Sequence, residues 1–362
     1  MGTTAASPSR RGPLPLRLAT VAAVALLLAF GVLGGLQRAG LAPAPALTAQ
    51  AALAHAALMI GAWLGSVIGI ERAVALKTRT ARLSPLLSLL AGAALLAGRP
   101  QLAAMLLVMA ATAFVATHLQ LWQRQRAAHV AVLGAAALCW WLGNMAWLLG
   151  RDDAAHDGIL AAWFAFLVLT IAAERLEMTR LLQRHRAAQP LFLALVGALL
   201  LGVAAGLVNA RAAAAPFGGL LLALAAWLAT QDIARITIRQ PGLPRYMAVA
   251  LWAGYAWLAV GGLAWAGMGA QPGWRDAALH ALGLGFVMSM VMAHAPVILP
   301  AVAGVKLRFS AAFYAPLALL HLSLAWRLLV DQRLGALLNT AALLLFAFTA
   351  IGAIVSWRRR HG

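Results

Sequence analysis

Acidic residues are scarce in this chain, because only 9 of its 362 residues are Asp or Glu and charged residues of both signs make up 10%. Soluble domains carry about 25% charged and about 45–50% apolar residues. Here 64% of the residues are hydrophobic and the mean hydropathy is +0.87. A water-soluble fold of this length could not bury so much apolar surface. The composition therefore predicts an all-α, polytopic membrane protein.

Cysteine is almost absent as well, since Cys139 is the single one and it lies in an apolar run. This excludes an intrachain disulfide and any iron–sulfur or zinc site built from cysteines. The motifs GxxxxGK[ST], GxGxxG and HExxH are also missing. The 28 Lys and Arg give a net charge of +19, but they lie in short loops between apolar runs. That placement indicates contacts with anionic membrane lipid rather than with nucleic acid.

Twelve apolar runs approach the length of about 20 residues that a membrane-spanning helix needs. We expect one span in each of the ranges 15–36, 49–75, 83–98, 101–123, 129–149, 156–178, 189–209, 213–236, 246–269, 275–303, 309–330 and 334–357. The connections are too short to hold a soluble domain. The prediction is one integral membrane domain over residues 1–362, with 1–14 as a cytoplasmic tail.

The cations predict the orientation of these spans. With the N-terminus inside, the cytoplasmic segments hold 21 of the Lys and Arg residues and the opposite side holds 7. Such a bias follows the positive-inside rule. We therefore expect both termini to be cytoplasmic, in a multi-pass protein of a bacterial inner membrane.

Five histidines fall within apolar runs, where each ring nitrogen needs a partner: His55, His118, His280, His294 and His321. The runs 49–75 and 275–303 are both even-numbered spans and so cross in the same direction. At about 1.5 Å per residue, His55 and His280 lie roughly 8–9 Å below the outer surface. Two histidines at one depth on different helices are what a haem iron with two axial imidazoles needs.

His280 and His294 are 14 residues apart, which places them about 21 Å apart along nearly one face of a helix. Cytochromes of the b type use this separation to hold two haems. The same depth arithmetic brings His118 near His294, so these two form a second candidate metal site. His321, at mid-membrane, is a candidate cofactor-binding residue, although it could equally pair with Ser323 or a backbone group.

Other residues of the run 275–303 fit a bound macrocycle. Gly283 and Gly285 would let a flat ring approach the helix closely. We expect Pro296 to break the helix just after His294 and to free the carbonyl of Met292. The methionines at 288, 290 and 292 point to different sides of a helix, so we interpret them as packing residues rather than as a copper(I) site.

The segments Tyr255-Ala-Trp-Leu-Ala and His280-Ala-Leu-Gly-Leu-Gly, with the closing spans from Ala318-Leu-Leu-His321 onward, resemble the NnrS family of twelve-span bacterial membrane proteins. His55-Ala-Ala-Leu-Met59 resembles that family's His-x-His-Glu-Met, with its second His and its Glu replaced. The resemblance implies haem b, copper and a role in the nitric oxide response. The catalytic subunit of haem-copper oxidases is similar too, with a low-spin haem between helices 2 and 10, where His55 and His280 stand.

The scarce carboxylates gather at the cytoplasmic ends of the even-numbered spans, as in Ile70-Glu71-Arg72, Glu174-Arg175 and Gln231-Asp232. They form interfacial ion pairs or, because carboxylates within a membrane are often functional, a site for proton uptake or a quinol head group. Three hypotheses follow for the whole chain. It is a haem-b protein of nitric oxide or nitrosative-stress tolerance, a transporter or permease with a histidine-lined pathway, or a non-catalytic assembly protein.

Overall fold

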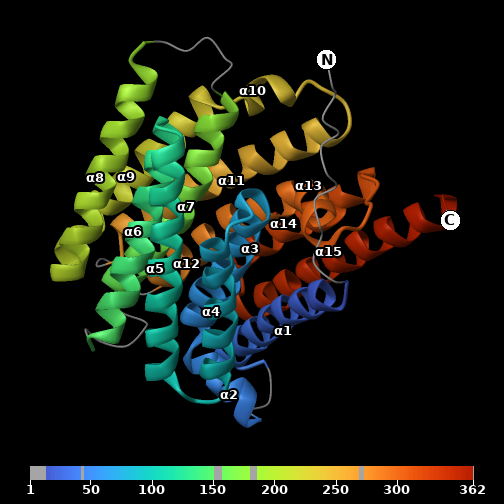
Figure 1. The fold of residues 1–362 in the computed structure, drawn as a ribbon, viewed down its shortest axis with the longest axis horizontal. Helices are drawn as coiled ribbons and strands as arrows, with labels where there is room; N and C mark the ends of the chain where they lie inside the picture. Colours follow the sequence, from blue (N-terminus) through green and yellow to red (C-terminus); the bar gives the residue numbers. More distant parts are fainter. Residues whose placement is uncertain (1–13, 42–44, 151–156, 180–185, 269–272, 362) are drawn as a thin grey trace, which may run out of the picture.

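The computed structural model describes residues 14–41, 45–150, 157–179, 186–268 and 273–361, and their regular structure is entirely helical (Figure 1). The helices are α1 (Leu14–Arg38), α2 (Ala46–Leu53), η1 (Ala57–Leu64), α3 (Gly65–Leu76), α4 (Arg79–Leu96), α5 (Pro100–Arg124), α6 (Ala128–Leu148), α7 (Asp157–Met178), α8 (Ala188–Val208), α9 (Ala210–Gln231), α10 (Ala234–Thr237), α11 (Leu243–Ala266), α12 (Trp274–His280), η3 (Ala281–Met288), α13 (Ser289–Ala303), η4 (Ala311–Phe313), α14 (Tyr314–Leu329) and α15 (Gln332–His361). Of the predicted tail, residues 1–13 lie outside the described ranges.

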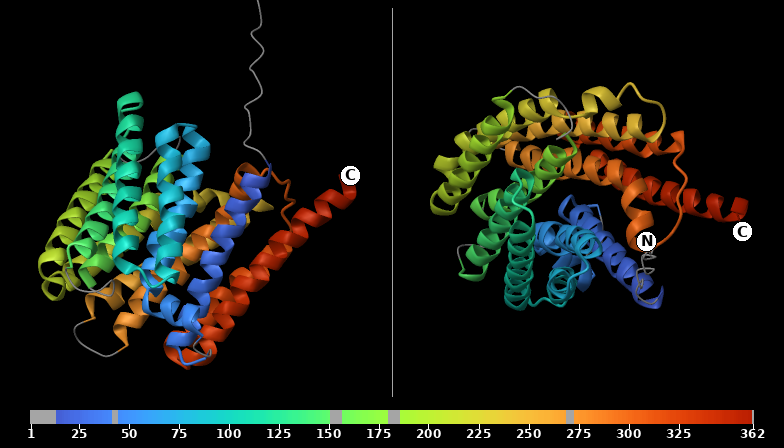
Figure 2. Two further views of the ribbon diagram at one scale, coloured as in Figure 1. Left: turned by 60° about the horizontal axis from the view of Figure 1, so that its bottom comes forward. Right: turned by 45° about the horizontal axis from the view of Figure 1, so that its top comes forward.

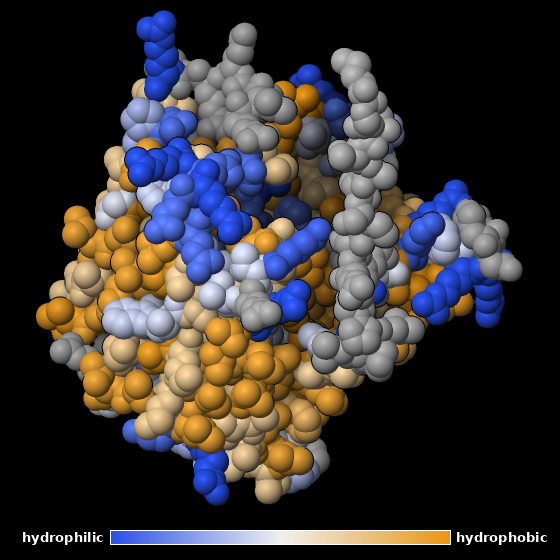
Figure 3. Space-filling model, in the orientation of Figure 1, coloured by the Kyte–Doolittle hydropathy of each residue, from blue (hydrophilic) through white to orange (hydrophobic). Residues whose placement is uncertain are grey.

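Within the described ranges, eleven helices are long and apolar enough to cross a membrane, and Thr80–Leu96 is a shorter apolar helix. Hydrophobic side chains cover much of the visible face, while hydrophilic ones gather mainly toward the top of the view (Figure 3). The exposed apolar side chains of α15, such as Leu344, Phe348 and Ile351, would face water in a soluble protein. The fold is therefore that of a polytopic membrane protein, as composition predicts.

Several helix starts follow from local chemistry. The Thr78 hydroxyl accepts a hydrogen bond from the backbone N–H of Ala81 at 3.3 Å, and the Asn209 amide oxygen accepts one from Ala212 at 3.0 Å. These bonds satisfy N–H groups that have no partner within the first helical turn. Pro100 opens α5, where its missing N–H costs nothing. Such caps keep the connections between helices short.

Two of the predicted spans each contain a π-helix between two α-helices. The run 49–75 is divided into α2, η1 and α3, and the run 275–303 into α12, η3 and α13. Both η1 and η3 are eight-residue π-helices. The expectation that Pro296 breaks the helix is wrong, because α13 continues through it to Ala303. The carbonyl of Met292 is nevertheless released from the helix and accepts a hydrogen bond from the Tyr246 hydroxyl at 3.1 Å.

Helix α7 lies at the centre of the molecule. In its 18-residue apolar stretch 89% of the residues are buried, the largest share among the candidate spans of the described chain. It contacts η1 and η3, and α3 contacts α13, so three long segments (η1–α3, α7 and η3–α13) meet as a central triad. Figure 2 shows the bundle that these segments form with the other helices.

Three arcs of helices connect the members of this triad. Helices α4, α5 and α6 pack in sequence between α3 and α7, and α8, α9 and α11 pack between α7 and η3–α13. Helices α14, α15 and α1 complete the circuit from η3 back to η1. Each arc thus has an interior bounded by two triad members. The α2 end and the α10 end, named after those short helices, are the two ends of this bundle (Figure 1).

A glycine contact holds α9 and α11 close together. A Cβ atom on Gly218 would collide with the backbone of Gly262 and Ala266, whereas one on the neighbouring Gly219 would meet nothing within 4 Å. Small residues at such crossings allow helices to approach closely in a membrane.

Replacement of Gly218 by alanine should therefore lower the thermal unfolding temperature of the detergent-purified protein. Overpacking of this kind costs about 1–3 kcal/mol. Gly219→Ala is the matched control and should leave that temperature unchanged or slightly raised, since alanine favours helix. Equal unfolding temperatures for the two variants would contradict the close contact.

Candidate functional site

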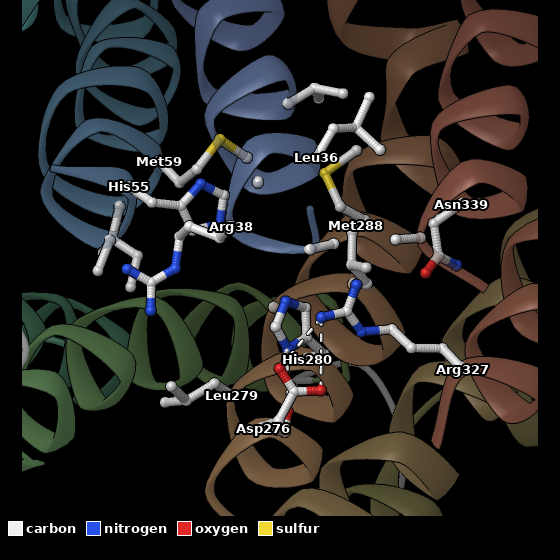
Figure 4. A pocket seen from close by; sticks show the side chains of 18 of the residues that line it. Leu36, Arg38, His55, Met59, Asp276, Leu279, His280, Met288, Arg327 and Asn339 are labelled. Carbon is white, nitrogen blue, oxygen red and sulfur yellow. Dashed lines mark hydrogen bonds and ion pairs between the residues drawn. The ribbon is translucent and has the colours of Figure 1, made fainter. Parts of the chain in front are cut away.

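A cavity of about 600 Å³ lies inside the third arc, toward the α2 end of the bundle. Its walls come from α1, η1, α7, α12, η3 and α15, with Arg327 contributed by α14. Small-molecule and cofactor sites generally measure about 300–1,000 Å³. Among the histidines in the apolar runs, His55 and His280 line this cavity (Figure 4).

His55 is held in place by α1. Its Nδ1–H donates to the carbonyl of Gly31 at 3.0 Å, and a Cβ atom on Gly35 would lie 3.0 Å from its Cε1. Glycine at position 35 therefore lets α1 lie directly against the imidazole. No described residue pairs with Nε2 of His55.

His280 is held by its own helix and by an ion pair. Its Nδ1–H donates to the carbonyl of Asp276 at 2.9 Å and lies 3.0 Å from the Asp276 carboxylate. That carboxylate also accepts hydrogen bonds of 3.1 and 3.4 Å from Nη2 of Arg327, whose side chain is 9% exposed. Here too, no described residue pairs with Nε2. The interaction fixes which nitrogen of His280 carries the proton.

The two imidazoles approach the cavity from the segments that directly precede two members of the triad, η1–α3 and η3–α13 (Figure 4). They are close enough for an electrostatic interaction between them. Each also lies at the start of a π-helix, since His280 directly precedes η3 and His55 lies two residues before η1. Such wide turns occur often at functional sites. The predicted equal depth of His55 and His280 is consistent with this placement on one cavity.

The cavity has apolar walls and a cationic rim. Met59, Phe164 and Met288 contribute apolar surface, while Arg38 and Arg327 contribute positive charge. Gly283 lines the cavity as expected, and a Cβ there would approach nothing nearer than the Phe164 ring at 3.9 Å. Gly285 instead faces Trp257, with which a Cβ would collide, so this glycine serves helix packing.

This donor set fits a haem. Two imidazoles expose free Nε2 atoms, both in the tautomer that can bind a metal through Nε2, on the surface of one largely apolar cavity. Arg38 and Arg327, the latter paired with Asp276, are cationic groups of the cavity that suit the carboxylates of a haem. The described residues contain no group of three His, Cys, Asp or Glu able to hold a metal ion.

His321 lies outside this cavity and is bonded at both nitrogens. The Trp257 indole N–H donates to His321 Nδ1 at 3.0 Å, and His321 Nε2 lies 3.4 Å from the Ser289 hydroxyl. Ser289 in turn donates to the carbonyl of Ala250 at 2.7 Å. This arrangement links α11, α13 and α14, so it explains His321 as a helix-joining residue rather than through the Ser323 pairing considered above.

His118 and His294 each form a hydrogen bond within their own helix. Each donates Nδ1–H to the carbonyl four residues earlier, at 2.9 Å for His118 and 2.8 Å for His294. Among the described residues, no hydrogen bond, ion pair or ring contact joins these two histidines to each other. Their assignment to one second metal site stays a prediction.

The carboxylates near the α10 end come together in space. Arg72 contacts both Glu71 and Glu174, and Arg175 forms a buried ion pair with Asp232 at 2.7 and 3.1 Å. His294 interacts electrostatically with Glu71, Arg175 and Asp232. We call these six residues the α10-end cluster. The ion pairing that the sequence suggested is present: Arg72–Glu174 joins α3 to α7, and Arg175–Asp232 joins α7 to the end of α9.

Sequence reasoning missed two residues of the cavity, Asp276 and Arg327, which hold His280. Met288, interpreted above as a packing residue, lines the cavity wall. Asp276 lies four residues before His280, a spacing that places them on one helix face and was a usable signal. The partnership with Arg327 depends on tertiary packing and leaves no local pattern.

A family model described as Domain of unknown function (DUF8744) matches residues 17–355, and the chain belongs to that family. No curated protein matches the chain. No solved structure matches it either.

The buried Arg175–Asp232 pair should matter more for stability than an exposed one. Asp232→Asn would leave a buried guanidinium without its partner, which costs about 3–5 kcal/mol. Asp157→Asn removes the half-exposed Arg275–Asp157 pair and should cost about 1 kcal/mol or less. Denaturant unfolding of the two purified variants measures both losses, and similar losses would refute this ranking.

Proposed function

We propose that this member of the DUF8744 family binds one b-type haem between His55 and His280. The observation that carries the proposal is the pair of free Nε2 atoms on the surface of one apolar cavity. In a membrane interior a polar nitrogen without a partner is costly. A single haem iron between the two Nε2 atoms would give both of them a partner.

The chain's own groups would orient the cofactor. The Gly31 carbonyl and Asp276 hold the two imidazole rings through Nδ1–H, which sets their planes and increases their donor strength. Arg38 and Arg327 supply positive charge for the propionates. When bound, a haem ligated on both faces supplies a one-electron redox centre, and a diatomic ligand would bind by displacing an imidazole, for which we favour His55.

The biological role rests on the resemblance to the NnrS family. That resemblance supports a part in the nitric oxide response or in nitrosative-stress tolerance, with nitric oxide or a quinol as the small-molecule partner. It also implies copper. Haem is supported by the two imidazoles at one cavity, whereas copper rests on the resemblance alone. The proposal is therefore confined to haem.

A transporter or permease with the histidines along its path is the runner-up, and a non-catalytic assembly protein is the third candidate. The cavity could serve the transporter as a substrate site. The fixed Nδ1–H bonds of His55 and His280 favour a rigid ligand site instead. A transporter would expose these rings to a hydrated path in at least one of its states.

In this proposal the protein crosses a bacterial inner membrane twelve times, with both termini in the cytoplasm. The eleven long helices and the shorter apolar helix Thr80–Leu96 supply twelve crossings. The α10 end, where the cation-rich connections lie, would then face the cytoplasm and the haem cavity would lie near the outer surface.

A reporter protein joined after Gly362 should test this topology. A fluorescent protein that folds only in the cytoplasm should be bright, and alkaline phosphatase, which needs the periplasm, should be inactive. The same reporters placed after Gly98 should give the opposite pattern. Active phosphatase after Gly362 would overturn the proposed orientation.

Haem absorbance tests the function directly. Protein purified from haem-replete cells should show a Soret band that is lost or strongly reduced in His55→Ala and in His280→Ala. His321→Ala is the matched control, since that histidine is likewise partly buried in the bundle but lies outside the cavity. It should keep the band.

Colourless, folded wild-type protein would argue against haem binding. A Soret band of equal intensity in all three variants would place the haem elsewhere. Gel filtration of each variant verifies that the fold survives the substitution.

A further inference from the structure

Five polar atoms on neighbouring helices are buried without a protein partner in the described part of the chain. They are Nε of Arg72 on α3, the hydroxyls of Ser84 and Ser88 on α4, Nε2 of His118 on α5 and Nε1 of Trp140 on α6. Both serines, His118 and Trp140 are at most 1% exposed. We call this set the α3–α6 seam. Its residues lie within the first arc of helices, away from the haem cavity of the third arc.

The seam residues are spatial neighbours. A Cβ atom on Gly65 would lie 2.7 Å from Cζ2 of Trp140 and 3.3 Å from the Ser88 hydroxyl, so both side chains meet above this glycine. Ser84 lies one helical turn from Ser88 on α4. The ring of Phe114 packs against His118 at 4.3 Å and against Trp140 at 5.7 Å between ring centroids, which connects the two.

The seam begins at the α10-end cluster, because Arg72 belongs to both and contacts Glu71 and Glu174. Helix α3 lies directly against α4 here, since a Cβ atom on Gly69 would lie 3.0 Å from Cδ of Pro85, the residue after Ser84. Nearer the middle of the bundle, Trp140 stacks on Phe166 at 4.9 Å. Leu64, which precedes Gly65, and Leu167, which follows Phe166, line the haem cavity. The seam thus lies between the ionic cluster and residues that line the cavity.

Buried polar atoms are almost always hydrogen-bonded, and water fills the gap where protein groups do not. The seam offers both kinds of partner. Trp140 Nε1–H and Arg72 Nε–H donate, the serine hydroxyls donate and accept, and His118 Nε2 accepts because its Nδ1–H is already given to the Phe114 carbonyl. Each water molecule donates two hydrogen bonds and accepts two, so several waters together would give every one of these atoms a partner.

We propose that a file of bound water fills the α3–α6 seam and carries protons between the α10-end cluster and the haem cavity. A proton enters from the Glu71–Glu174 side, moves along the hydrogen-bonded waters, and leaves an identical file behind after the waters reorient. No electron moves in this step. The role of the haem cavity as the end point of the proton rests on the proposed haem site, whereas the presence of the water file does not.

Hydrogen exchange of two indoles tests for the water. Trp140 and Trp163 are both fully buried, but the Trp163 N–H is bonded to the Asn144 amide oxygen at 2.9 Å. In ¹⁵N-tryptophan spectra of the full chain in nanodiscs, assigned with Trp140→Phe and Trp163→Phe, the Trp140 indole should exchange into D₂O about tenfold faster or more. Equal protection of the two indoles would overturn the water file.

Proton flux tests the conduction. Proteoliposomes with an imposed pH gradient and an internal pH dye should lose the gradient faster than empty vesicles when valinomycin clamps the potential. His118→Phe removes the accepting nitrogen at similar volume and should return the rate to that of empty vesicles. The matched His321→Phe variant alters a bonded histidine off the seam and should keep the wild-type rate.

Equal rates for wild type and His118→Phe would overturn proton conduction. Neither measurement requires haem, so a colourless protein with a positive result would refute the proposed haem site and leave the seam intact. A Soret band with equal indole protection would do the reverse.

Discussion

A neutral imidazole inside a membrane has two nitrogens to satisfy, and this requirement organises the polar interior of the protein. At His55, His118, His280 and His294 the Nδ1–H is given to a backbone carbonyl, so Nε2 is the nitrogen left over. His321 differs, because Trp257 donates to its Nδ1 and Ser289 lies beside its Nε2. The same rule thus separates a structural histidine from those that can hold something else.

The central triad determines where the free nitrogens lie. Its members meet in the middle of the bundle, with His55 and His280 toward one end and the α10-end cluster toward the other. The π-helices η1 and η3 begin beside the two cavity histidines. A π-turn widens the helix and changes the direction in which later side chains point. In this way all three members of the triad contribute residues both to the cavity and to the ionic cluster.

Much of this arrangement could be predicted from residues alone. The alternation of apolar runs and cation-rich loops indicated the helices, and the co-directional runs 49–75 and 275–303 indicated that His55 and His280 share a depth. The π-helices could not be anticipated, since their sequences Ala57–Leu64 and Ala281–Met288 are as apolar as any regular helix. The seam was also invisible, because Ser84, Ser88 and Trp140 are ordinary residues until packing removes their partners. Depth along a helix can be counted from sequence, whereas the facing of helices depends on packing.

The most direct measurement is an experimental structure of the protein purified with its natural cofactor. We predict one haem in the cavity of the third arc, with its iron about 2 Å from Nε2 of both His55 and His280 and its propionates toward Arg38 and Arg327. A haem bound at His118 or His294, or a cavity filled by lipid with both Nε2 atoms unligated, would contradict the central role of this histidine pair.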